Sequence, residues 1–138
     1  MMESEDFDWC GYYKLGDSYI HNNNQAKLRT GISRFYYAAF CKSRNLLNRR
    51  KTYLNEKSRK IMTSKNADVH SETSRIFKNH EEYNREDIGK IISKELNKLR
   101  RMRNQADYDN IINEPLDNML FESKIRSKRI IDLLNEID

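Results

Sequence analysis

The chain has 138 residues, a net charge of +5 and a charged fraction of 34%, with only four glycines and one proline. A chain of this length forms one domain, and so few chain breakers exclude a sandwich of short strands, a collagen-like repeat and a proline-rich linker. The aromatic fraction of 10% is higher than disordered segments usually carry. These values predict one helical domain with a thin core and charged outer faces.

The first two predicted helices follow from apolar residues at helical spacing. A helix capped by Ser4 buries Phe7 and Cys10, because serine is a favoured cap residue. The asparagines at residues 22–24 end this helix and cap the next one. The second helix runs from about residue 25 to residue 48 and carries the clearest apolar stripe in the sequence.

The chain after residue 48 predicts two short elements and two long ones. The periodicity fades over residues 49–67, where we expect one short helical piece within a long basic connection. Asp68 caps a short helix, Asn84 starts a long helix, and Pro115 suits the first turn of the last one. We therefore predict a single all-α domain over residues 1–138. Its architecture is an antiparallel up-and-down bundle of four long helices plus one or two short helices.

Localisation and metal binding follow from what the sequence lacks. The longest apolar run, residues 35–41, is far shorter than the roughly 20 residues that cross a bilayer. The first six residues are acidic, unlike the basic start of a signal peptide. We therefore expect a cytoplasmic protein with no membrane partner. Cys10 and Cys41 have no second Cys or His at ligand spacing, so we expect free thiols, no metal site and no cofactor.

Basic residues are concentrated in two places. Residues 42–65 contain nine Lys or Arg and one acid, and residues 98–103 contain four Lys or Arg. Such clusters attract partners that carry phosphate, such as RNA or a nucleotide. The alternative is that they are solvated helix faces. The candidate phosphate-binding residues are Arg49, Arg50, Lys51, Arg100, Arg101, Arg103 and Asn104.

Arg103 and Asp107 form the most specific pair in the sequence. They are four residues apart on a predicted helix, at the edge of its apolar stripe, where an ion pair forms readily. A guanidinium that is oriented by a carboxylate is suited to binding phosphate with two hydrogen bonds. The alternative is an ordinary helix ion pair, worth about 0.3–0.5 kcal/mol.

Three stretches resemble one known family. Residues 32–40 read ISRFYYAAF, which is similar to the SRxYYAxF signature of the stand-alone bacterial and archaeal branch of the HEPN domain family. Residues 99–108 resemble that branch's LxxxRxxADY stretch. Residues 70–77, with Thr73 at the Val position, resemble its HxxVxxxF stretch. The matches occur in order and span most of the chain.

The resemblance implies a HEPN helical bundle that is usually a homodimer. Such proteins are often encoded beside a small nucleotidyltransferase, as a toxin–antitoxin pair. Many are metal-independent endoribonucleases in which an Arg stabilises the phosphate charge. In those enzymes a His, separated from the Arg by four to six residues, acts at the ribose 2′-hydroxyl or its neighbours.

The predicted catalytic residues are Arg103, Asp107, Tyr108 and His70. Arg103 matches the motif's Arg, but Tyr108 stands where the enzymes have His, and a phenol with a pKa near 10 is a poor base at neutral pH. An ideal helix also separates Arg103 and Tyr108 by about 140°. They share a cleft only if the helix ends near Asp107 or a dimer partner supplies one of them. His70 is a candidate substitute base, with a helix cap or a surface residue as the alternative.

Three functions are consistent with these residues. The first is a HEPN-type protein that binds RNA or a nucleotide, with a degenerate Arg-x4-Tyr motif and a nucleotidyltransferase-type antitoxin as partner. The second is a metal-independent endoribonuclease toxin that uses Arg103. The third is a purely structural helical protein that pairs with other helices.

Overall fold

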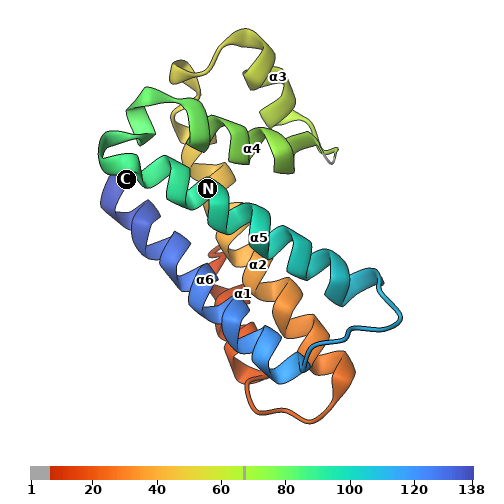
Figure 1. Ribbon diagram of the computed structural model, residues 1–138. Coiled ribbons are helices and arrows are strands. Elements are labelled where there is room, and N and C mark those ends of the chain that lie inside the picture. Colours follow the sequence, from red (N-terminus) through yellow and green to blue (C-terminus); the bar gives the residue numbers. More distant parts are fainter. Residues whose placement is uncertain (1–6, 67) are drawn as a thin grey trace, which may run out of the picture.

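The computed structural model describes residues 7–66 and 68–138, and this part of the chain is helical and contains no strand (Figure 1). The all-α prediction is confirmed. Short 3-10 turns cover Lys51–Tyr53, Glu81–Tyr83 and Arg85–Asp87. The α-helices are α1 (Cys10–Ser18), α2 (Gln25–Arg49), α3 (Glu56–Thr63), α4 (Asp68–Asn79), α5 (Ile88–Tyr108) and α6 (Leu116–Ile137).

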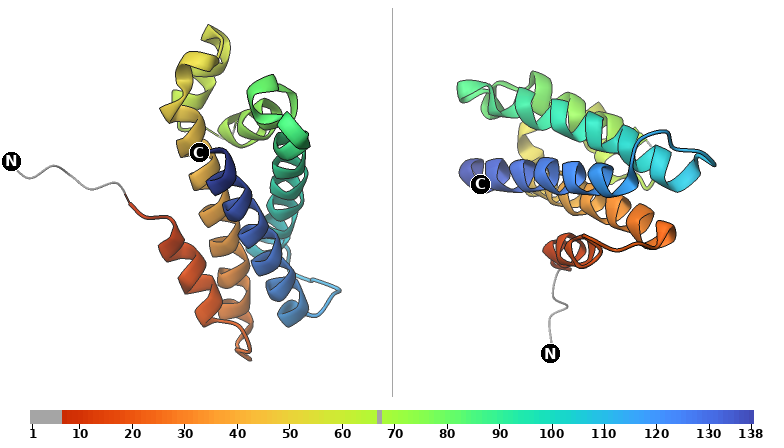
Figure 2. Two further views of the ribbon diagram at one scale, coloured as in Figure 1. Left: turned by 90° about the vertical axis from the view of Figure 1, so that its left-hand side faces the viewer. Right: turned by 60° about the horizontal axis from the view of Figure 1, so that its bottom comes forward.

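The helices lie in layers, with α2 and α6 in the middle (Figures 1 and 2). α1 packs on the outer side of α2, and α4 and α5 form the opposite layer, with α3 against α4. α2 and α6 run in the same direction, because the Ser127 hydroxyl donates to the Phe35 carbonyl at 2.8 Å and Arg50 donates to the Ile137 carbonyl at 2.7 Å. α1 and α5 run the opposite way.

Three of these helices are long, rather than the four that were predicted. α2, α5 and α6 have 25, 21 and 22 residues, whereas α1 has nine. Ser4 lies outside the described residues. Within them α1 begins only at Cys10, where the Asp8 carboxylate accepts a hydrogen bond from the Cys10 amide at 3.0 Å. Phe7 precedes the helix and is 55% exposed, so its predicted place in the core is wrong.

α2 is the central helix and matches its prediction to within one residue. The Asn24 side chain caps it by accepting a hydrogen bond from the Lys27 amide at 3.1 Å. Gly31 lets α6 approach closely, since a Cβ atom there would lie 2.7 Å from Leu120. The buried apolar side chains of α2 are Leu28, Ile32, Phe35, Tyr36, Ala38, Ala39, Phe40, Cys41, Leu46 and Leu47.

The connection between α2 and α5 holds the two short helices that the sequence predicts there. They are α3, capped by Asn55, and α4. Asp68 is the first residue of α4 rather than its cap, and its amide donates to the Asn66 side chain at 2.9 Å. Of the described helices none has the length and apolar character that a membrane span requires.

Candidate functional site

Arg103 is buried between α5 and α2. Its guanidinium lies 3.8 Å from the Asp107 carboxylate, which confirms the predicted ion pair, and the Ser33 hydroxyl donates to the same carboxylate at 3.4 Å. The guanidinium carbon lies 5.4 Å and 5.5 Å from the ring centres of Tyr36 and Tyr37. Arg103 is only 8% exposed, and its Nε atom has no hydrogen-bond partner among the described residues. Within a single chain it does not face an open groove.

Tyr108 does not share a site with Arg103 in one chain. α5 continues through Tyr108, so the two side chains diverge as the ideal helix requires. Tyr108 is 74% exposed, whereas Arg103 is buried. Within one protomer the two side chains are therefore not brought together, because α5 keeps its helical geometry up to Tyr108, its last residue.

His70 is held by aromatic residues of α2. Its Nδ1 atom lies 2.5 Å from the Tyr36 hydroxyl, and its ring stacks on Phe40 with 4.1 Å between ring centres. Burial, and then the positive charges of Arg100 and Arg103, lower the pKa of His70 to about 4. The imidazole is therefore neutral at physiological pH. Burial also raises the pKa of Tyr36 far above its usual value, so the phenol keeps its proton.

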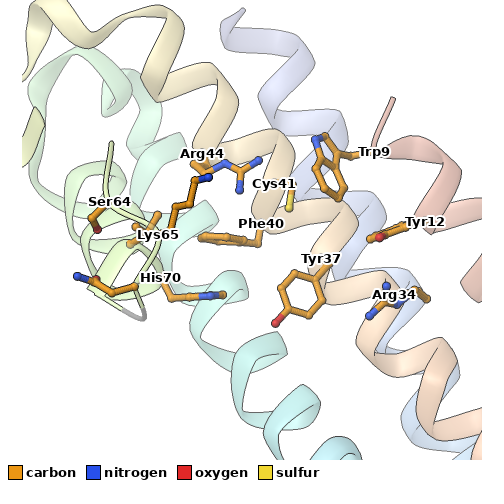
Figure 3. Close-up of a pocket in the computed structure, with 12 residues that line it drawn as sticks. Trp9, Tyr12, Arg34, Tyr37, Phe40, Cys41, Arg44, Ser64, Lys65 and His70 are labelled. Carbon is orange, nitrogen blue, oxygen red and sulfur yellow. The ribbon is translucent and has the colours of Figure 1, made fainter. Parts of the chain in front are cut away.

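A cleft of about 560 Å³ lies on the outer face of α2, and we call it the α1–α2–α4 cleft (Figure 3). Figure 3 shows that the α1 segment supplies one wall, α2 supplies the floor, and the turn between α3 and α4 supplies the other wall. The lining residues are Trp9, Tyr12, Arg34, Tyr37, Phe40, Cys41, Arg44, Ser64, Lys65, Asn66, Val69 and His70.

The two arginines of the cleft lie over aromatic rings. The Arg34 guanidinium carbon is 4.5 Å from the ring centre of Tyr12, and that of Arg44 is 5.6 Å from the ring centre of Trp9. Cations bind favourably over such ring faces. With Lys65 the cleft carries three positive charges, and none of the described residues that line it is acidic. This combination of cations and aromatic faces suits an anion that carries a planar ring.

The predicted phosphate-binding residues are not gathered at one site. Arg49 lies 2.9 Å from the Asp138 carboxylate, and Arg50 donates to the Ile137 carbonyl, so both hold the end of α6. Arg100 donates to the Ser71 hydroxyl at 3.3 Å. Three further candidates are exposed and do not line the cleft, namely Lys51, Arg101 and Asn104.

Of all the predicted site residues, only His70 lines the α1–α2–α4 cleft. Sequence reasoning missed Trp9, Tyr12 and Lys65, which carry no local signal of shared position. A signal existed for α2, where Arg34, Tyr37 and further lining residues recur at three- or four-residue steps beside the apolar stripe. Such a polar and aromatic stripe indicates a helix face that is neither core nor fully solvated.

Comparisons with protein-family models, with curated proteins and with solved structures gave no match to the chain. Within residues 7–66 and 68–138 no group of three His, Cys, Asp or Glu side chains is arranged to hold a metal ion. The cleft itself and the motifs of the sequence are therefore the features from which the function is inferred.

Proposed function

We propose that the chain is a HEPN-type protein that binds RNA or a nucleotide in the α1–α2–α4 cleft, as one member of a toxin–antitoxin or defence pair. The observation that carries this proposal is the lining of the cleft, with three cations, four aromatic rings and no carboxylate among its described residues. Aromatic faces stack nucleobases of any type, and arginines bind phosphate with paired hydrogen bonds.

The motif residue Arg103 contacts Tyr37, whose ring lines this cleft. Its guanidinium lies 5.5 Å from the ring centre of Tyr37, while that of Arg34 lies 5.4 Å from the same ring. Arg103 therefore positions a ring of the cleft and adds positive charge beneath it. The resemblance of residues 32–40 and 99–108 to HEPN motifs supports a homodimer with a nucleotidyltransferase-type partner as the functional assembly.

The binding proposal is tested with a labelled single-stranded RNA oligonucleotide and fluorescence anisotropy. We expect Arg34→Ala and Arg44→Ala each to weaken binding by about tenfold or more, because a hydrogen bond to a charged group contributes about 1.5–3 kcal/mol. Arg85→Ala is the matched control, since this exposed arginine does not line the cleft. Circular dichroism checks that each variant is folded.

Equal affinity of the two cleft variants and the wild-type protein would contradict binding in this cleft. Absence of binding to both RNA and mononucleotides would favour the third function, a purely structural helical protein.

A metal-independent endoribonuclease is the second candidate function. The observation that favours it is that His70 and Arg103 both contact Tyr36, which is buried in α2 next to the lining residue Tyr37. In this reaction the ribose 2′-hydroxyl attacks the adjacent phosphorus, the bond to the 5′-oxygen breaks, and a cyclic phosphate and a 5′-hydroxyl end result. A guanidinium stabilises the charge that develops on the phosphate oxygens.

The nuclease candidate is tested by incubating RNA with excess protein in EDTA. Cleavage should persist without metal and should be lost in Arg103→Met. Methionine keeps an apolar stem for packing, but it leaves the Asp107 carboxylate without its cation. Because removing one partner of a buried ion pair is destabilising, circular dichroism checks that this variant is folded. Intact RNA after prolonged incubation with the wild-type protein would eliminate this candidate.

A further inference from the structure

We propose that the cleft recognises an unpaired nucleobase by stacking it on Trp9, so that its ligand is an unpaired nucleotide rather than duplex RNA. This inference rests on the proposed function. It adds that the nucleobase is the part of the ligand that is recognised and that Trp9 recognises it. The unpaired nucleotide is either part of a single strand or a free mononucleotide, and both present the same ring and phosphate chemistry.

Trp9 offers a ring face that no aromatic side chain of the described residues covers by parallel stacking. Its aromatic neighbours Phe7 and Tyr12 meet it at interplanar angles of 72° and 80°. The Arg44 guanidinium carbon lies 5.6 Å from the ring centre, near the outer limit of about 6 Å for a cation over an aromatic ring. The indole is half-buried. A planar ligand can therefore replace the loosely placed guanidinium over the indole.

The wall that carries Trp9 is anchored at its far end. A Cβ atom at Gly16 would lie 3.0 Å from Phe35, so the last turn of α1 sits directly against α2. Lys124 of α6 lies 2.6 Å from the Asp17 carboxylate in the same turn. These contacts hold α1 along α2, so that the position of Trp9 relative to the floor of the cleft is set before a ligand binds. Such pre-organisation reduces the cost of binding.

The opposite wall is suited to the polar part of a nucleotide. Ser64, Lys65 and His70 lie across α2 from Trp9 (Figure 3). Once Arg44 is displaced from the indole, Arg44 and Lys65 are two cations of the lining that can bind the phosphate. The volume of about 560 Å³ falls within the roughly 300–1,000 Å³ typical of small-molecule sites.

Duplex RNA does not present what this wall binds. Its bases are stacked on one another inside the helix, and proteins read it mainly through backbone contacts and shape. Unpaired bases, in contrast, stack on aromatic side chains. The charge of the cleft attracts both forms, so the indole is the feature that discriminates between them.

The experiment uses the intrinsic fluorescence of Trp9, which is the only tryptophan of the chain. The wild-type protein is titrated with an unstructured single-stranded RNA, with AMP, with a duplex RNA of equal length and with tripolyphosphate, which carries charge but no base. We expect saturable quenching by the single strand and by AMP, and none by the duplex or by tripolyphosphate. The first two arms distinguish the single strand from the free nucleotide as the tighter ligand.

Substitutions test the same contact without relying on fluorescence. Trp9→Ala should weaken single-strand binding, measured by anisotropy, by about tenfold, as is typical of one lost stacking contact, and Trp9→Phe should restore most of the affinity. Phe7→Ala is the matched control, because Phe7 packs on Trp9 but does not line the cleft. It should bind like the wild-type protein.

Three results would overturn the inference. One is RNA binding by anisotropy with unchanged Trp9 emission and unchanged affinity of Trp9→Ala, which leaves the proposed function intact. Another is equal quenching by tripolyphosphate, which shows movement of Arg44 without stacking. The third is equal quenching by duplex RNA. Absence of binding in every assay would contradict the proposed function as well.

Discussion

At the scale of single residues, the hydrogen bond between Tyr36 and His70 determines the chemistry of the cleft floor. The raised pKa of Tyr36 keeps its hydroxyl protonated, and a buried hydroxyl requires an acceptor. Nδ1 of His70, at 2.5 Å, is the acceptor that the described residues provide. With Tyr36 as the donor, the neutral imidazole carries its proton on Nε2, and this nitrogen then donates rather than accepts a hydrogen bond. The role of His70 as a substitute base stays a prediction.

The pKa of His70 predicts a pH-dependent stability. Its value of about 4 in the folded protein lies below the ordinary value of 6.5. Between these two values the unfolded chain binds a proton that the folded chain does not, so the free energy of unfolding decreases as the pH falls through this window. We expect urea denaturation at a series of pH values to show this decrease, and His70→Gln to flatten it. A His70 imidazole signal that titrates near pH 6.5 by NMR would contradict the prediction.

The candidate site was only partly predictable from its residues. The ion pair of Arg103 and Asp107 was predictable because contacts four residues apart depend on helix geometry alone. That Arg103 is buried was not, because its burial depends on Tyr36 and Tyr37 of another helix. Whether a residue at the edge of an apolar stripe lies at the surface or in an interface depends on which helix packs beside it.

At the scale of secondary-structure elements, the junction of α4 and α5 is held by a side-chain bridge and by a close backbone contact. The Asn84 side chain donates to the Phe77 carbonyl at 3.0 Å and accepts from the Lys90 amide at 3.0 Å, so it joins the end of α4 to the start of α5. Glu86 and Asp87 both adopt positive φ angles, of 61° and 60°. Asn84 was predicted as a start signal, and it fulfils that role through its side chain rather than as the first residue of the helix.

Gly89 allows α4 and α5 to meet at this junction. A Cβ atom there would lie 2.1 Å from the Phe77 carbonyl oxygen, and a backbone atom cannot move away as a side chain can. We expect Gly89→Ala to lower the free energy of unfolding by about 3 kcal/mol, at the upper end of the cost of overpacking. Urea denaturation measures this change.

Gly11→Ala is the matched control for Gly89→Ala. A Cβ atom at Gly11 would meet only Phe7, at 3.8 Å, which is an ordinary contact. Alanine should therefore stabilise α1 by about 0.5–1 kcal/mol through its higher helix propensity. Equal effects of the two substitutions would contradict the close approach at Gly89.

At the scale of the whole molecule, charge is distributed unevenly between paired and unpaired sites. Many surface cations lie near carboxylates, as in the network of Arg126 with Glu95 and Glu122 on α5 and α6. The two arginines of the α1–α2–α4 cleft instead lie over aromatic rings, with no acidic residue in its described lining. In this chain with a net charge of +5, three cations therefore lie in a hollow whose described lining holds no carboxylate.

Salt dependence tests this distribution of charge. Each phosphate contact on a single strand contributes about −0.7 to the slope of log affinity against log salt concentration. Three contacts, from Arg34, Arg44 and Lys65, predict a slope of about −2 and a loss of about 20-fold between about 50 and about 200 mM salt. Lys65→Gln should reduce the slope by about 0.7. A slope near zero, or one unaffected by this substitution, would show that the cleft does not hold the phosphates.

The sequence by itself determined what depends on local spacing. Helical periodicity and few chain breakers predicted an all-α chain, the bounds of α2 and the ion pair on α5, because intrahelical contacts follow from one repeating geometry. Tertiary structure alone decided how many helices are long, which side of Arg103 is covered, and that Trp9, Arg44 and Lys65 line one cleft. These outcomes depend on which helix faces pack against one another across the core. Contacts between residues far apart in the sequence cannot be inferred from local spacing.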